Sequence, residues 1–127
     1  MPHPIAFLNA FNITKGATLG AQTKILKVSI KHIVVEQYKH YTFPMTIEIQ
    51  TAKQLNEDDI LKQFNCFLLD NKNKNNRKVN SQYGNPYNCI ITDIQIKKKK
   101  AVLDHHQYYT ITCLGDAVRI KRETKTQ

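Results

Sequence analysis

The feature that most limits the fold is an unbroken alternation of apolar and polar residues from position 41 to position 50. One face of this segment carries Tyr41, Phe43, Met45, Ile47 and Ile49, and the other carries Thr42, Pro44, Thr46, Glu48 and Gln50. A period of two is typical of a β-strand with one buried face. Because proline cannot donate to a ladder, we expect this strand to lie at a sheet edge or to bulge at Pro44.

A second alternation lies just before the first. Lys24, Leu26, Val28, Ile30, His32 and Val34 occupy one of its faces, and Lys27, Ser29 and Lys31 form a basic opposite face. Further strands are predicted for residues 5–13, 66–70, 88–96, 107–114 and 117–121, with a break at Gly115 and Asp116. In the segment 88–96, Ile90, Thr92, Ile94 and Ile96 are predicted to share one face.

The periodicity becomes helical after position 51. Leu55, Ile60, Leu61 and Phe64 fall near helical spacing, Asn56 is a good N-cap, and three acidic residues follow it. We therefore predict one helix within residues 52–65. Residues 71–88 are polar and are predicted to form a long exposed loop, and residues 122–127 a frayed basic tail. With 127 residues and no linker, the chain is predicted to be a single domain, 1–127.

Three strands, a helix and two more strands follow the element order of the oligonucleotide/oligosaccharide-binding (OB) fold. The expected fold is therefore mainly β, a small five-stranded Greek-key barrel with one helix between strands three and four. The segments PIAFLNAF, GATLG, TKILKVSIKHIVV and TIEIQ resemble the smallest subunits of heterotrimeric single-stranded DNA-binding complexes, namely replication protein A and the CST telomere complex. The chain departs from them in its longer 71–88 loop and in lacking their C-terminal amphipathic helix.

This resemblance implies a non-catalytic scaffold subunit. Its partners would be other protein subunits of a hetero-complex and single-stranded DNA or RNA, in a telomeric or replicative role and with a nuclear location. A rival resemblance rests on ITDIQIKKKK and HHQYYTITCLGDAVRI, which are similar to the last strands of type VI secretion and phage tail-tube proteins. That resemblance implies a β-barrel that stacks into rings of identical subunits.

The net charge of +9 also indicates a polyanionic partner. OB-folds bind single strands with a positive groove and with aromatic rings on which bases stack. The predicted nucleic-acid-binding residues are Lys27, Lys31, Tyr38, Lys39, Arg77, Lys78, Tyr83, Tyr87, Lys97, Lys98, Lys99, Lys100 and Tyr108. The competing interpretation makes the lysines a solvated face and the tyrosines half-buried barrel closures. Apolar Ile33, Val35, Cys89 and Ile91 on otherwise polar faces favour a protein–protein interface.

Sequence motifs for catalysis are missing. No GxSxG, P-loop, GxGxxG or HExxH occurs, so no enzymatic activity and no cofactor is predicted. The three cysteines are odd in number and lie in apolar runs, which favours buried free thiols in a reducing compartment. His105 and His106 lack further ligands at a suitable spacing, so no metal site is predicted. No signal peptide or membrane-spanning stretch is recognised, and we expect an intracellular protein without membrane contact.

Overall fold

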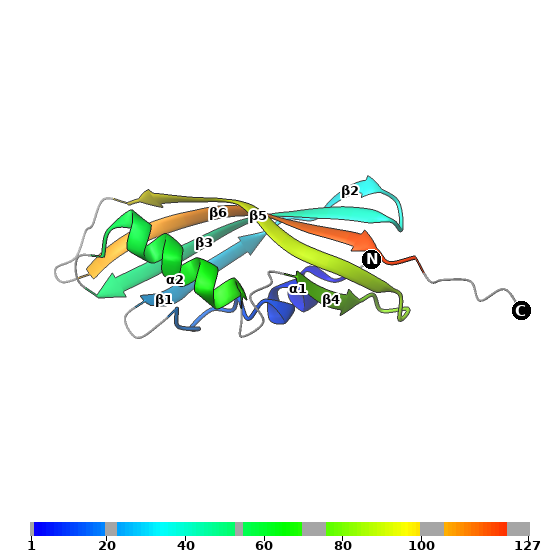
Figure 1. Cartoon of the computed structure of the whole chain (residues 1–127), viewed down its shortest axis with the longest axis horizontal. Helices are drawn as coiled ribbons and strands as arrows, with labels where there is room; N and C mark the ends of the chain where they lie inside the picture. Colours follow the sequence, from blue (N-terminus) through cyan, green and yellow to red (C-terminus); the bar gives the residue numbers. More distant parts are fainter. Residues whose placement is uncertain (1, 20–22, 53–54, 70–75, 100–105, 122–127) are drawn as a thin grey trace, which may run out of the picture.

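A single antiparallel sheet of six strands dominates the computed structural model (Figure 1). The structure describes residues 2–19, 23–52, 55–69, 76–99 and 106–121. The strands are β1 (Thr23–Ile30), β2 (Ile33–Glu36), β3 (His40–Ala52), β4 (Asn76–Asn80), β5 (Pro86–Lys98) and β6 (His106–Arg119). Their order in the sheet is β1-β3-β6-β5-β4, and β2 pairs with β3 on the same side as β1. The sheet is long and curled into a half-barrel.

Two helices cover the inner face of this sheet, α1 (Pro4–Ala10) and α2 (Glu57–Leu69). We call inner the face that carries the buried alternating residues of β3, and outer the opposite face. Buried residues from both helices and from β1, β3, β4, β5 and β6 form one hydrophobic cluster. The mainly β architecture and the helix that follows β3 agree with the prediction, whereas the sheet has six strands and not five, and the structure has two helices and not one.

Strand β3 follows the predicted alternation. Its residues Tyr41, Phe43, Met45, Ile47 and Ile49 are all buried on the inner face. The strand is paired on both sides, so Pro44 does not lie in an edge strand. Its carbonyl accepts a hydrogen bond from the Lys31 N–H at 2.9 Å, at the junction where β1 ends and β2 begins. In an antiparallel strand the N–H and C=O of one residue point toward the same neighbouring strand. The N–H that Pro44 lacks would therefore point to the gap between the β1–β3 and β2–β3 pairings, where no ladder hydrogen bond is lost.

The N-terminal segment is helical, and its prediction as a strand was wrong. Nδ1 of His3 accepts the Ile5 N–H at 3.1 Å and caps the helix, and Pro4 starts it with a preset φ angle. Helical spacing then places Phe7 and Phe11 on one buried side of α1, with ring centroids 5.0 Å apart. The Phe7 ring also packs against Phe43 at 4.7 Å. Short apolar runs fit helix and strand equally well, and here the cap decides.

The predicted helix after β3 is confirmed, but it begins at Glu57 and ends four residues later than expected. Oδ1 of Asn56 accepts the Asp59 N–H at 2.8 Å, which confirms the N-cap. Ile60, Phe64 and Leu68 are buried at intervals of four residues. The helical pattern thus continues through residues 66–69, where a short strand was predicted, and position 70 lies outside the described residues.

The polar tract 71–88 is not one long loop. Residues 76–80 form β4, a short turn follows, and β5 begins at Pro86. Val79 and Tyr87 lie opposite each other and are buried, so they anchor this hairpin to the core. Oγ of Ser81 accepts the N–H of Asn85 at 3.1 Å and organises the turn. Residues 71–75 lie outside the described residues, as does the predicted tail 122–127.

Two predictions about β5 and β6 were also wrong. The register of β5 against β6 shifts between Thr92 and Gln95, at a bulge where Asp93 has a φ of 55°. Ile90 is therefore exposed on the outer face, while Ile96 lies opposite buried Ile111 on the inner face.

Strand β6 runs through the predicted break without interruption. A Cβ at Gly115 would lie 2.5 Å from Cζ of Phe7. Glycine is thus required at this position because α1 packs closely against the strand, and not because the chain turns there.

Candidate nucleic-acid interface

Two rows of polar residues cross the outer face at the end of the sheet that lies over α2. Residues directly opposite each other in antiparallel strands share a face. The first row contains Lys24, Gln50, Tyr108 and Lys99, and the second contains Lys27, Glu48, Thr110 and Lys97. In each row two lysines, one from β1 and one from β5 or the residue after it, flank two polar residues of β3 and β6. We call the four lysines the lysine frame.

The lysine frame borders a strip of defined width. Neighbouring strands in a sheet lie about 4.8 Å apart, so three intervals separate β1 from β5 by about 14 Å. Lys24, Lys27, Lys97 and Lys99 are all exposed. The strip therefore has cations along both borders and hydrogen-bonding side chains along its floor, an arrangement suited to an extended polyanion.

Glu48 is the one carboxylate in these two rows, and it forms an ion pair with Lys99. The hydrogen bond from Lys99 lowers the pKa of Glu48, with smaller Coulombic contributions from Lys99 and Lys27, against an opposing effect of burial. Glu48 is therefore ionised at neutral pH. The formal charge of the two rows is 4 − 1 = +3.

Tyr108 lies within the strip. It stands opposite Gln50 in β3, and its carbonyl accepts the Lys99 N–H at 2.8 Å. Its side chain is half-buried, which leaves part of the ring accessible on the outer face. An aromatic ring between lysines is the combination that single-stranded nucleic acid requires for base stacking and phosphate contact.

Three other predicted lysines lie near the frame with different orientations. Lys31 is exposed beside Pro44, four residues after Lys27 and just past the end of β1. Lys98 stands opposite buried Tyr109, on the inner face near the start of α2. Lys100 lies outside the described residues.

Four predicted residues lie at the opposite end of the sheet, away from the lysine frame. Tyr38 and Lys39 belong to the β2–β3 turn, Tyr83 belongs to the β4–β5 turn, and Lys78 lies in β4. All four are exposed, and Lys39 forms an ion pair with Glu36 at 3.3 Å. The structure therefore divides the predicted residues into two separate groups.

Arg77 and Tyr87 point inward, and neither presents its side chain on the outer face. Nη2 of Arg77 donates to the Leu68 carbonyl at 2.8 Å, and its guanidinium lies 5.6 Å from the centre of the Phe11 ring. Arg77 thus satisfies a free carbonyl at the end of α2. Tyr87 is buried, and its hydroxyl donates to the Tyr38 carbonyl at 2.7 Å. Burial also raises the pKa of Tyr87.

Four members of the two rows were missed, namely Lys24, Glu48, Gln50 and Thr110. The alternation placed Lys24 on the same face as Leu26 and opposite Lys27. A register shift between Ile25 and Lys27 instead lets Lys24 and Lys27 share the outer face. The position of such a bulge depends on the pairing with β3, and the sequence of β1 alone gives no signal for it.

The cysteines and the predicted apolar interface residues divide between core and surface. Cys89 and Cys113 are buried, and burial raises the pKa of each thiol to about 12. Cys66 is exposed on α2, in contrast to the prediction of a buried thiol. Cys89 and Ile91 belong to the core, so their prediction as interface residues was wrong, whereas Ile33 is 48% and Val35 56% exposed.

Comparisons with protein-family models, curated proteins and solved structures give no match to this chain. Within the described ranges, no helix is long and apolar enough to cross a membrane. The same ranges contain no group of three or more histidine, cysteine or acidic side chains arranged to hold a metal ion.

Proposed function

We propose that this chain is a non-catalytic, OB-like subunit of a hetero-complex that binds single-stranded nucleic acid. The complex is of the telomeric or replicative type, it is nuclear, and the nucleic acid is DNA or RNA. The chain acts as a scaffold and contributes phosphate contacts. The single observation that carries the proposal is the lysine frame, in which lysines about 70 positions apart flank one polar strip.

The strip suits a single strand better than it suits a compact anion. Its four cations lie along two borders and do not converge on one point. Thr110, Gln50 and Tyr108 provide hydrogen bonds and one aromatic surface between those borders. Phosphates can follow the lysines while a base stacks on Tyr108, a contact that contributes about 1–3 kcal/mol in proteins of this kind.

The test is the salt dependence of binding to a fluorescent oligothymidylate of about 15 nucleotides. Four phosphate contacts predict a slope of about −3 for log affinity against log salt concentration, since each contact contributes about −0.7 on a single strand. Replacing Lys27 by alanine should reduce the magnitude of the slope by about 0.7. The matched control, Lys62→Ala, removes an exposed lysine from α2 and should leave the slope unchanged. An equal effect of both substitutions would place the binding outside the lysine frame.

One observation favours a second candidate, a ring-forming tube protein of the type VI secretion or phage-tail kind. Strand β2 has exposed apolar residues and pairs with β3 along one edge, and a free sheet edge is a common site of self-association. Rings of identical subunits in native mass spectrometry, unaffected by oligonucleotide, would favour this candidate over the first.

A further inference from the structure

The β2–β3 hairpin carries an exposed strand edge at the end of the sheet away from α2 (Figure 1). Among the described residues, β2 pairs with no strand other than β3. Ile33, Val34 and Val35 are 48%, 50% and 56% exposed. An edge strand presents unpaired backbone N–H and C=O groups to which another extended chain can bind.

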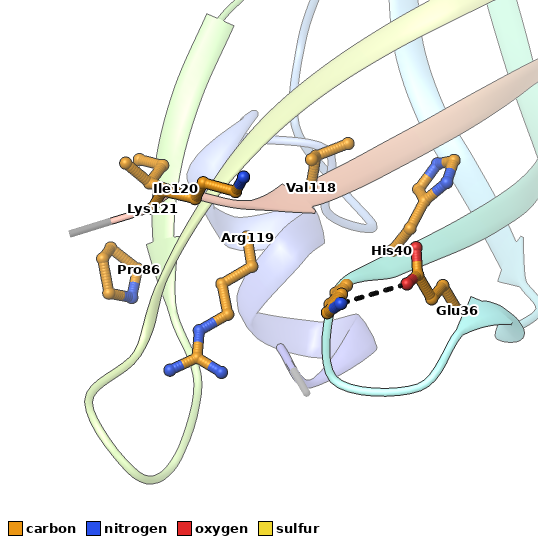
Figure 2. A pocket seen from close by; sticks show the side chains of 8 residues that line it. Glu36, His40, Pro86, Val118, Arg119, Ile120 and Lys121 are labelled. Atoms are coloured by element: carbon orange, nitrogen blue, oxygen red, sulfur yellow. Dashed lines mark ion pairs between the residues drawn. The ribbon is translucent and has the colours of Figure 1, made fainter. Parts of the chain in front are cut away.

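A groove of about 580 Å³ adjoins this edge (Figure 2). It lies where the β2–β3 turn meets the start of β5 and the end of β6. Two backbone hydrogen bonds hold these segments together, from the Arg119 N–H to the Lys39 carbonyl at 2.8 Å and from the Ile120 N–H to the Pro86 carbonyl at 3.0 Å. Glu36, the last residue of β2, also lines the groove, so the edge and the groove form one continuous surface.

The groove combines an apolar lining with excess positive charge. Its apolar residues are Pro86, Val118 and Ile120, and its cations are Lys39, Arg119 and Lys121. Glu36 is its single carboxylate and is already paired with Lys39, so the formal charge is 3 − 1 = +2. Nη2 of Arg119 donates to the neutral side chain of Asn85 at 3.2 Å. Across the described part of the chain, no carboxylate pairs with Arg119 or Lys121.

We propose that the free edge of β2 and this groove together dock an extended, acidic segment of a partner protein. The segment adds to β2 as a further strand, through backbone hydrogen bonds and apolar contact with Ile33, and its continuation past Glu36 enters the groove, where it contacts Val118. Its carboxylates then reach Arg119 and Lys121 beyond the end of β2. The guanidinium of Arg119 can bind a carboxylate with two parallel hydrogen bonds. The existence of a partner subunit rests on the proposed function, but the docking surface lies at the other end of the sheet from the lysine frame.

Two other occupants fit the surface less well. A second copy of this chain brings a net charge of +9 to a surface that is itself positive, so the two copies repel each other. A nucleic acid strand can use the cations but has no peptide groups to pair with β2. An acidic peptide uses the strand edge, the apolar residues and the cations together. Tyr38 and Tyr83, exposed on the two turns beside the groove, also belong to a residue type that is enriched in protein interfaces.

The test is a titration of the ¹⁵N-labelled full chain, followed by NMR. The probes are synthetic peptides of about nine residues in which valine alternates with glutamate, lysine or serine. The glutamate peptide should shift the amide signals of Ile33 to Glu36 and of Arg119, and should bind at least tenfold more tightly than the other two. Equal binding of the three peptides, or signal changes confined to β1 and the end of β5, would overturn the proposal. So would oligothymidylate that shifts the groove signals while the glutamate peptide does not.

Paired variants separate this site from the lysine frame. Arg119→Glu combined with Lys121→Glu should weaken binding of the glutamate peptide at least tenfold and leave oligothymidylate binding unchanged. Lys97→Glu should have the opposite pattern. Val34→Asp should weaken peptide binding, whereas Ile5→Asp, at an exposed apolar residue of α1, should not. If the unmodified chain binds the glutamate peptide but not oligothymidylate, the proposed function is refuted and the docking site stands. Circular dichroism should be used to check that each variant is folded. A folded Arg119→Glu/Lys121→Glu variant that binds the glutamate peptide normally would refute the docking site.

Discussion

The two ends of the outer face share one sheet but carry different chemistry. The end over α2 carries the lysine frame around Glu48 and Tyr108. The other end carries Ile33, Ile90 and Val118, all exposed, with His40 and Asp116 paired at 2.5 Å between them. Rows of exposed lysines suit phosphate, whereas exposed apolar residues of this kind are typical of the central part of protein interfaces. In our proposals, the lysine end accordingly binds nucleic acid and the apolar end binds a partner protein.

The inner face mirrors this difference. Beneath the lysine end lies α2, where the Thr23 hydroxyl donates to Gln63 at 2.9 Å and the Tyr109 hydroxyl donates to the Leu55 carbonyl at 2.6 Å. Beneath the apolar end, the Phe7 ring of α1 contacts Phe43 and the backbone at Gly115. One end is thus supported partly by hydrogen bonds, and the other by close aromatic packing that tolerates little added volume.

The largest expected effect comes from Gly115→Ala, which tests the support of the apolar end. The new methyl group would lie 2.5 Å from Phe7, whose ring is enclosed by Phe11 and Phe43. Overpacking of this kind costs about 2–3 kcal/mol of unfolding free energy, which urea denaturation measures. At temperatures where the variant is folded, changes in amide chemical shift should concentrate at the apolar end, with the salt slope for oligonucleotide unchanged.

A compensating substitution makes this prediction specific. Phe7→Leu in the Gly115→Ala background removes the ring atoms that the methyl group meets, so the two substitutions together should cost less than the sum of their separate effects. Strict additivity would show that the Phe7 ring is not the cause of the destabilisation.

The sequence predicted the regular parts of this fold and failed where packing decides. The alternation of β3 and the capped helix after Asn56 are local patterns, and both were recognised. The position of α1 on the sheet depends on the fit of Phe7 against Gly115, and β4 depends on the burial of Val79 opposite Tyr87. Neither contact is visible in a local window of sequence, which is why polar composition near position 76 was taken for a loop.

The same limit applies to the candidate site. Residue type alone identified four members of the two rows, Lys27, Lys97, Lys99 and Tyr108. Their position around one strip follows from the pairing of β1, β3, β6 and β5. Two bulges then decide which side chains face outward. Without the shift after Ile25, Lys24 and Lys27 would lie on opposite faces of the sheet. Without the shift at Asp93, Ile90 and Ile96 would share one face.

A smaller effect is expected from Asp93→Val, which tests the bulge that joins the two ends. Asp93 has a φ of 55°, a region that aspartate tolerates and that β-branched residues avoid. Valine should therefore lower the unfolding free energy by about 1–2 kcal/mol. Asp93→Gly is the matched control, because glycine adopts this φ freely, and it should leave stability unchanged or slightly increased. If chemical denaturation finds both variants equally stable, the backbone conformation at this bulge does not constrain the residue.

The smallest effect is expected from Glu48→Gln, which removes the one carboxylate of the lysine end. The loss of this charge removes the group that competes with phosphate for Lys99 and should raise affinity for oligothymidylate about two- to fivefold in a fluorescence titration. The ion pair is partly exposed, so its loss should lower the unfolding free energy by only about 0.5 kcal/mol at neutral pH.

The stability difference should also depend on pH in a defined direction. Folding lowers the pKa of Glu48. The contribution of Glu48 to the unfolding free energy is therefore present above its unfolded pKa of 4.5 and is lost as the pH falls through its pKa in the folded protein. Wild type and Glu48→Gln should therefore converge in stability under acid conditions and differ near neutrality. A difference that grew on acidification would contradict the ion pair, and an unchanged oligonucleotide affinity at neutral pH would mean that bound nucleic acid does not use Lys99.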